Sequence, residues 1–188
     1  MRLFCYLEKW AEILIIKESV DNMLGVRVES DLAKGIKKEI VKEKEILGAY
    51  DLVLNDYGPD RYLGSIHIEV ADTLTVADID RISRKITKTI LEKYGVILHT
   101  IGVYSVNTKD KKIIEAKKEI IKIVFAHKGI LQMHGFYFNE KEKSISFDII
   151  IDFKVKNRED IYKDIYDEVK RKYKDYKIDI TLDIDISD

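Results

Sequence analysis

Residues 65–104, SIHIEVADTLTVADIDRISRKITKTILEKYGVILHTIGVY, decide the fold. Ser65–Val70 alternates polar and apolar residues, which is the pattern of a half-buried strand. Thr75 is a suitable N-cap for the helix that follows, whose isoleucines recur at helical spacing, and Gly95 is suited to end it. Val96–Tyr104 is apolar and rich in β-branched residues, which indicates a second strand. The stretch therefore predicts the order strand, helix, strand.

The residues before this stretch add a helix and another strand. Ser30 and Asp31 are good N-cap candidates for a helix that runs to about Lys44. Residues 52–54 are apolar and predict a strand, and the turn-forming residues 55–60 end it. The first half of the chain therefore has the predicted order α-β-β-α-β.

The same order is predicted again in the second half of the chain. The expected elements are a helix over 113–127, a strand over 130–138, a charged turn over 139–143, a strand over 144–153, a helix over 160–173 and a strand over 176–186. Matching Gly48 to Gly129 and Ile97 to Ile178 gives the same offset of 81 residues. We interpret this as an internal duplication of one structural unit.

Each unit is expected to be an α+β sandwich of the ferredoxin-like kind. Its two helices can cover only one face of a three-stranded sheet, which we predict to be antiparallel. The other face stays open in each unit. Because an open sheet face or edge normally pairs with something, we expect self-association or packing between the two units.

Composition and motifs exclude several classes of function. The 188 residues carry 33 Lys and Arg against 34 Asp and Glu, a net charge of -1, so we expect no nucleic-acid partner. Cys5 is the lone cysteine, which fits a reducing cytoplasm. Charged residues interrupt every apolar window long enough to span a membrane. Motifs for phosphate, dinucleotide or nucleophile chemistry are absent, so we expect no enzyme, and a small hydrolase on this fold has no nucleophile and base to name.

Five stretches of the first half carry a family resemblance. They are KESVDNMLG (17–25), GAYDLVL (48–54), YGPDR (57–61), IHIEV (66–70) and YGVILH (94–99). In combination they resemble the cytoplasmic C-terminal domain of cation diffusion facilitator transporters, and the first stretch looks like the linker after that family's last membrane helix. The second half resembles, in element order, an extra C-terminal domain of some bacterial members.

The resemblance implies a domain division and a set of partners. It implies a linker helix over 1–28, a dimerisation domain over 29–107 and a second αββαβ domain over 108–188. It further implies a homodimer at the cytoplasmic face of the cell membrane, attached to the transmembrane domain of a parent transporter for Zn²⁺, Fe²⁺ or Mn²⁺. The chain would be either the soluble part of such a transporter or a free-standing relative.

The resemblance also implies metal ligands in the first unit. His67, His99 and Asp80 fall at or near positions where the family places ligands, and imidazole is a good ligand for borderline cations. Tyr50 and Ile101 stand where metal-binding members carry a histidine and a carboxylate, so a site for Zn²⁺ or another divalent cation is expected to be weak or absent. Simple alternation places His67 and His99 on opposite sheet faces, and a bulge or a dimer partner would reconcile them.

The second unit holds further histidines and carboxylates. His127 is expected in the last turn of a helix, where the macrodipole favours it without a metal, and His134 lies on a strand. Polar positions of two neighbouring strands carry the aspartates Asp148, Asp152, Asp179, Asp183 and Asp185. Such carboxylates could hold a hard cation through oxygen, but nearby lysines favour a solvated face.

Two functional interpretations follow. In the first, the chain is the regulatory and dimerising cytoplasmic region of a divalent metal cation efflux transporter, without the membrane helices that carry the transport site. In the second, it is a non-enzymatic ligand-binding or interaction module of duplicated units without metal sensing.

Overall fold

The computed structural model describes residues 30–56, 58 and 62–183. The first unit contains α2 (Ser30–Ile40), β1 (Ile46–Asp56), β2 (Tyr62–Ala71), α3 (Val76–Tyr94) and β3 (Val96–Val106). The second contains α4 (Lys111–Ala126), β4 (Ile130–Asn139), β5 (Ser144–Ile151), α5 (Arg158–Lys172) and β6 (Lys177–Asp183). The predicted α-β-β-α-β order is confirmed in both halves, although the first helix ends at Ile40 instead of Lys44. The predicted linker helix and most of the 57–61 turn lie outside the described residues.

Each unit has its own three-stranded sheet. The strand orders are β1-β2-β3 and β4-β5-β6. In each sheet the first two strands are antiparallel, but the second and third are parallel, so the antiparallel prediction is wrong for half of the pairings. The reason is the crossover helix: α3 and α5 carry the chain back along the sheet, so the next strand starts from the same end as the previous one.

The helices of each unit cover one face of its sheet. Buried isoleucines of α2 and α3 pack with those of β2 in one core cluster, and α4 and α5 pack against β4, β5 and β6 in a second. On α3 the buried residues Ile82, Ile86 and Ile90 recur every four residues, which places them on one side of the helix. The two cores are separate, as expected for two ferredoxin-like units of α+β class.

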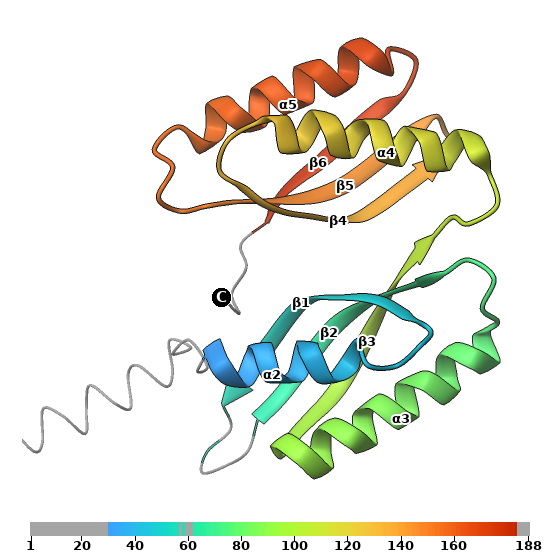
Figure 1. Cartoon of the computed structure of the whole chain (residues 1–188), viewed down its shortest axis with the longest axis vertical. Coiled ribbons are helices and arrows are strands. Elements are labelled where there is room, and N and C mark those ends of the chain that lie inside the picture. The colour runs from blue at the N-terminus through green and yellow to red at the C-terminus, as the bar shows by residue number, and fades with distance from the viewer. Residues whose placement is uncertain (1–29, 57, 59–61, 184–188) are drawn as a thin grey trace, which may run out of the picture.

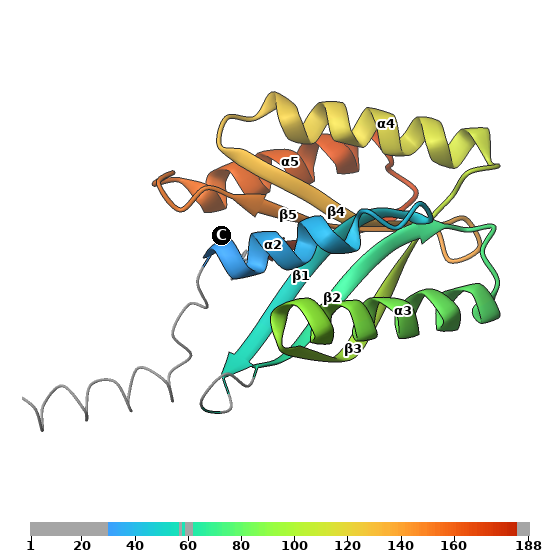
Figure 2. The ribbon, with the colours of Figure 1, turned by 60° about the horizontal axis from the view of Figure 1, so that its bottom comes forward.

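The two uncovered sheet faces lie toward each other (Figures 1 and 2). The helices α4 and α5 lie on the outside of one unit and α3 on the outside of the other. Ring stacking of Tyr50 in β1 on His134 in β4 joins the two faces. At another point Lys117 Nζ in α4 lies 3.1 Å from Glu69 Oε1 in β2. The predicted packing between the units is therefore present within one chain.

A short connection between β3 and α4 holds the units close together. Both the amide and the hydroxyl of Thr108 donate to Asp72 Oδ1, at 3.1 and 2.6 Å. Asn107 Oδ1 accepts hydrogen bonds from the amides of Lys109 and Asp110, and Asp110 caps α4 by accepting from Lys112. The connection is therefore bonded to the first unit at one end and to the second at the other.

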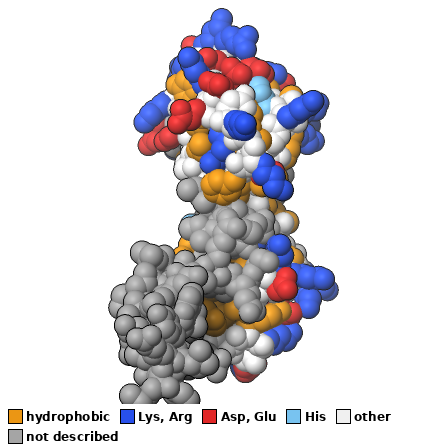
Figure 3. All heavy atoms as spheres, turned by 90° about the vertical axis from the view of Figure 1, so that its left-hand side faces the viewer, with side chains coloured by type: hydrophobic (Ala, Val, Ile, Leu, Met, Phe, Trp, Pro, Cys, Tyr) orange, Lys and Arg blue, Asp and Glu red, His pale blue; other side chains and the backbone are white. Residues whose placement is uncertain are grey.

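The surface of the second unit mixes both signs of charge. On the face shown in Figure 3, lysines and arginines lie among aspartates and glutamates over this unit. Among the helices of the described part of the chain, none combines the length and the apolar character that a membrane span requires.

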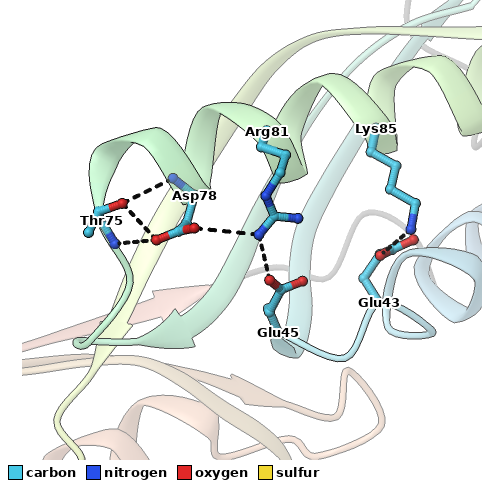
Figure 4. Close-up of polar contacts among 6 residues, drawn as sticks. All are labelled: Glu43, Glu45, Thr75, Asp78, Arg81 and Lys85. Atoms are coloured by element: carbon cyan, nitrogen blue, oxygen red, sulfur yellow. Dashed lines mark hydrogen bonds and ion pairs between the residues drawn. The ribbon is translucent and has the colours of Figure 1, made fainter.

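The start of α3 depends on a capping box (Figure 4). The Thr75 hydroxyl accepts from the Asp78 amide at 3.2 Å, and the Asp78 carboxylate accepts from the Thr75 amide at 3.0 Å. Two backbone donors that no helical carbonyl can reach are thereby satisfied. One turn further on, Arg81 bonds to Glu45 at 2.6 Å and Lys85 to Glu43 at 2.8 Å, which ties the helix to the chain segment before β1.

We predict that Thr75→Ala lowers the free energy of unfolding by about 1 kcal/mol, because the first turn of α3 loses its side-chain acceptor. Thr75→Ser keeps the hydroxyl and is expected to retain most of that stability. Guanidinium unfolding followed by circular dichroism measures both. An unchanged midpoint for Thr75→Ala would show that the capping box contributes nothing to the stability of the chain.

Candidate functional site

The pairing registers show which positions of the two units are equivalent. In the first unit Tyr50 is opposite His67, and in the second His134 is opposite Asp148, each pair directly before a break in the register. The parallel partners extend the match to Tyr104 and Asp183 on the third strands. The offset is therefore 84 residues in the first strand, 81 in the second and 79 in the third. Matching Gly48 to Gly129 misplaces the first strand by three residues, because insertions differ between strands.

Equivalent bulges aim side chains into the space between the units. Both β1 and β4 have a register break at this point, and the residue that begins it is left-handed: Asp51 has φ 54° and Gly135 has φ 64°. Such a conformation is ordinary for glycine but costs energy for aspartate. Strain of this kind persists where the surroundings enforce it, and it gathers at functional sites. In this chain the strained residue is the one whose carboxylate reaches across to the second unit.

Asp51 is the centre of the contacts between the units. Its Oδ1 lies 2.7 Å from His134 Nε2 of the second unit. Its Oδ2 lies 2.9 Å from His67 Nδ1 and accepts a hydrogen bond from the Tyr104 hydroxyl at 2.7 Å. One carboxylate therefore contacts two imidazoles and a phenol from three other strands.

His134 is enclosed completely, with 0% of its side chain exposed. Its ring stacks on Tyr50 at 5.0 Å between centroids, with planes 7° apart. Besides Asp51, its Nε2 lies 3.5 Å from an oxygen of Asp183 and 3.9 Å from one of Asp148. On the other side of the ring, Nδ1 is 3.2 Å from the Gln132 amide nitrogen. The imidazole is thus held in one orientation, with Nε2 toward three carboxylates.

His67 and Tyr104 form the first-unit wall of the site. Their rings stack at 4.6 Å between centroids. Gly102 makes this possible, because a Cβ on that residue would lie 2.0 Å from the His67 ring. On the second-unit side a Cβ on Gly135 would lie 2.7 Å from Asp148 Oδ2, so no side chain fits there. The pseudo-symmetric arrangement therefore has room for an acidic residue at the bulge of one unit only.

The proximity of unlike groups shifts several pKa values. Burial raises the pKa of Asp51, but contacts with His134 and Tyr104 outweigh burial and bring it to about 2. Burial lowers the pKa of His134, but the carboxylates of Asp51, Asp148 and Asp183 outweigh it, and the pKa lies above its usual value. Burial and the Asp51 carboxylate both raise the pKa of Tyr104, which keeps its hydroxyl a hydrogen-bond donor.

Asp51, His134 and Asp183 are the described residues that could hold a metal ion together. One ligand atom from each lies within 4.8 Å of the others, which is close enough for a shared cation. The group combines an imidazole nitrogen with carboxylate oxygens, a donor set suited to divalent transition metals.

The sequence-predicted ligands lie at three separate places. His67 belongs to the site through Asp51, whereas His99 is exposed on β3. Asp80 is exposed on α3, where it accepts a hydrogen bond from Arg84 Nε at 2.9 Å. Within the residues that the structure describes, no contact joins these three side chains to one another, so whether they bind metal together stays a prediction.

A bulge at His99 removes one objection to that prediction. In the β2–β3 pairing Gly64 is opposite Leu98 and Ser65 is opposite Thr100, which leaves His99 unpaired. Leu98 before the bulge and Ile101 after it both pack in the core, so His99 and Thr100 are excluded from the helix-covered face together. His99 is therefore on the same side of the sheet as His67, as the sequence required of a bulge.

The second unit supplies site residues for which the sequence favoured other roles. The solvated-face interpretation is wrong for Asp148 and Asp183, which lie between the units beside His134. It holds for Asp179, which is exposed, while Asp185 lies outside the described residues. His127, at the end of α4, lies 3.4 Å from Glu168 instead. A signal was present: an offset of 84 residues pairs His134 with Tyr50, where the family resemblance expects a histidine.

Acid titration tests the role of Asp51 in the metal-free protein. A carboxyl with a folded-state pKa near 2 and an ordinary value of 3.8 adds stability above pH 4, and this is lost as the pH falls toward 2. With EDTA present, we predict that Asp51→Asn lowers the free energy of unfolding by up to about 2 kcal/mol at pH 6 and by almost nothing at pH 2. Asparagine tolerates the left-handed backbone, so the substitution isolates the charge.

The matched control for this titration is Asp179→Asn, which changes an exposed carboxylate of β6 and should leave unfolding unchanged at both pH values. Equal destabilisation by Asp51→Asn at pH 6 and pH 2 would contradict a charge-dependent role.

Comparison with known proteins places the first unit in a family. Residues 28–101 match the family described as cation efflux protein, cytoplasmic domain. Among solved structures, the chain is similar to the MamB CTD magnetosome protein of Desulfamplus magnetovallimortis BW-1, with 20% sequence identity and a TM-score of 0.35 over 43% of this chain and 98% of that one. No curated protein matches the sequence. Through residues 28–101, which form its cytoplasmic domain, the chain belongs to the cation efflux, or cation diffusion facilitator, family.

Proposed function

We propose that this chain is the regulatory and dimerising cytoplasmic part of a divalent-cation efflux transporter, with no enzymatic activity. The observation that carries the proposal is the match of residues 28–101 to the cytoplasmic domain of cation efflux proteins. The partners in this proposal are a second copy of the chain and a transmembrane domain, which places the chain at the cytoplasmic face of the membrane.

The proposed regulatory ligands in the first unit are His67, His99 and Asp80, with Zn²⁺ as the leading cation. The bulge in β3 supports this, since it puts both histidines on the side of the sheet that the helices leave uncovered. Asp80 is exposed on α3, which leaves it accessible to a partner subunit. Ile97, which is 45% exposed two residues before His99, adds apolar surface for a subunit contact.

The proposed mechanism is a shift between arrangements of the two subunits. A cation bound between them favours the arrangement that brings its ligands together, and this arrangement in turn favours one state of the attached membrane domain. Such a shift can be no larger than the difference in metal affinity between the two arrangements. A site that lacks two family ligands, at Tyr50 and Ile101, is therefore suited to respond only at high metal concentration.

A second candidate function is an interaction module without metal sensing. It is favoured by the contacts that two of the proposed ligands already make, His67 with Asp51 and Asp80 with Arg84. Side chains with such partners need no metal to explain their positions.

We predict that Zn²⁺ increases the dimer fraction of the full chain and that the double variant His67→Ala/His99→Ala abolishes this increase. Sedimentation velocity with and without Zn²⁺, combined with calorimetric titration, measures both effects. His127→Ala is the matched control, because this histidine pairs with Glu168 in the second unit and should leave dimerisation unchanged. A wild-type chain that stays monomeric at every Zn²⁺ concentration would sink the proposal and favour the interaction module.

A further inference from the structure

We propose that Asp51, His134 and Asp183 form a binding site for a divalent transition-metal cation that joins the two units within one chain. Two of these residues lie beyond the segment that matches the cation efflux domain. The site is therefore distinct from the first-unit ligands His67, His99 and Asp80, and it needs no second subunit.

The burial of His134 is the first observation. Its side chain is 0% exposed, and its Nε2 has no hydrogen-bond partner among the described residues, although Asp51 Oδ1 lies only 2.7 Å away. The two atoms are close but not aligned for an N–H···O bond. A buried imidazole nitrogen normally has a partner, because leaving it without one is costly. A cation placed among the three groups would supply the missing partner.

The charge of the surroundings is the second observation. Three carboxylates, those of Asp51, Asp148 and Asp183, have oxygens within 3.9 Å of His134 Nε2. All three are less than a third exposed, so water screens their mutual repulsion only in part. A neutral imidazole leaves this group with three negative charges. A divalent cation offsets most of them, whereas a proton on the imidazole offsets one.

The donor set selects the class of cation. One imidazole nitrogen with two carboxylate oxygens, and Asp148 near enough to add a third, suits Zn²⁺, Co²⁺, Fe²⁺ or Mn²⁺. Ca²⁺ requires six to eight oxygens and is disfavoured by the nitrogen. The soft Cu⁺ ion is disfavoured by the absence of sulfur among these side chains. Gln132 beside His134 Nδ1 can orient the ring through its amide, as outer partners of ligating histidines do.

The backbone supports a single site. Asp51 adopts the left-handed conformation at a bulge where the equivalent residue is Gly135. The chain thus accepts strain at the one position from which a carboxylate reaches His134. The equivalent position in the second unit has no space for a side chain. One cation per chain follows, and not a pair related by the repeat.

The placement of the ligands makes the cation a link between the units. Asp51 comes from β1, whereas His134 and Asp183 come from β4 and β6. If the units separated, the cation would lose a ligand from one side. Binding and docking of the units are therefore coupled, and each stabilises the other.

Titration of the full chain with Co²⁺ tests the proposal, because bound Co²⁺ gives visible absorption bands that depend on its ligands. We expect one Co²⁺ per chain in this site, displaced by Zn²⁺. We expect His134→Gln and Asp183→Asn each to weaken Co²⁺ binding by at least tenfold and to change the absorption spectrum. Asp183→Asn alters a partly exposed side chain, so it serves as the test if His134→Gln fails to fold by circular dichroism.

The controls separate this site from the proposed first-unit site. Asp179→Asn lies on the same strand as Asp183, and His127→Gln removes another second-unit histidine, so both should retain wild-type Co²⁺ affinity and spectrum. His99→Ala tests only the first-unit ligands and should also leave the spectrum unchanged, whatever its effect on dimerisation. Wild-type affinity in both His134→Gln and Asp183→Asn, or no Co²⁺ bound by the wild-type chain, would overturn the proposal. In that case the cluster is a buried ion pair.

Discussion

The contact between Asp51 and His134 is the interaction on which the arrangement of the two units depends. Each unit buries its own core, so neither needs the other to cover apolar side chains. What remains is a sheet face in each unit that carries histidine, tyrosine and aspartate instead of isoleucine. Polar groups in such a space are stable only when they have partners, and the carboxylate of Asp51 supplies one to both histidines and to Tyr104.

Divergence of the repeat explains why these faces fit. If two identical units met around a two-fold axis, each site residue would face a copy of itself. Here the equivalent positions differ: Tyr50 has become His134, and Tyr104 has become Asp183. The meeting faces therefore combine bases with acids and stack an imidazole on a phenol. The histidine that family members carry at the position of Tyr50 is present here on the opposite unit.

Local sequence patterns were sufficient for the elements and insufficient for the site. Periodic isoleucines and capping residues such as Thr75 predicted the order of helices and strands correctly, because these signals act within one element. The parallel pairing of β2 and β3 depends on the crossover of α3, and the left-handed backbone of Asp51 depends on its surroundings. His134 was missed for a related reason: a bulge moves it to the open face, which alternation along the strand does not reveal.

The short, hydrogen-bonded connection at residues 107–110 changes how this interface responds to its environment. When a site is shared by separate subunits, its occupancy depends on how much protein is present as well as on how much ligand. Tethering makes the meeting of the two faces an intramolecular event with a fixed effective concentration. Opening and closing of this interface is therefore the same at any expression level, so one unit can act as a permanent, built-in partner for the other.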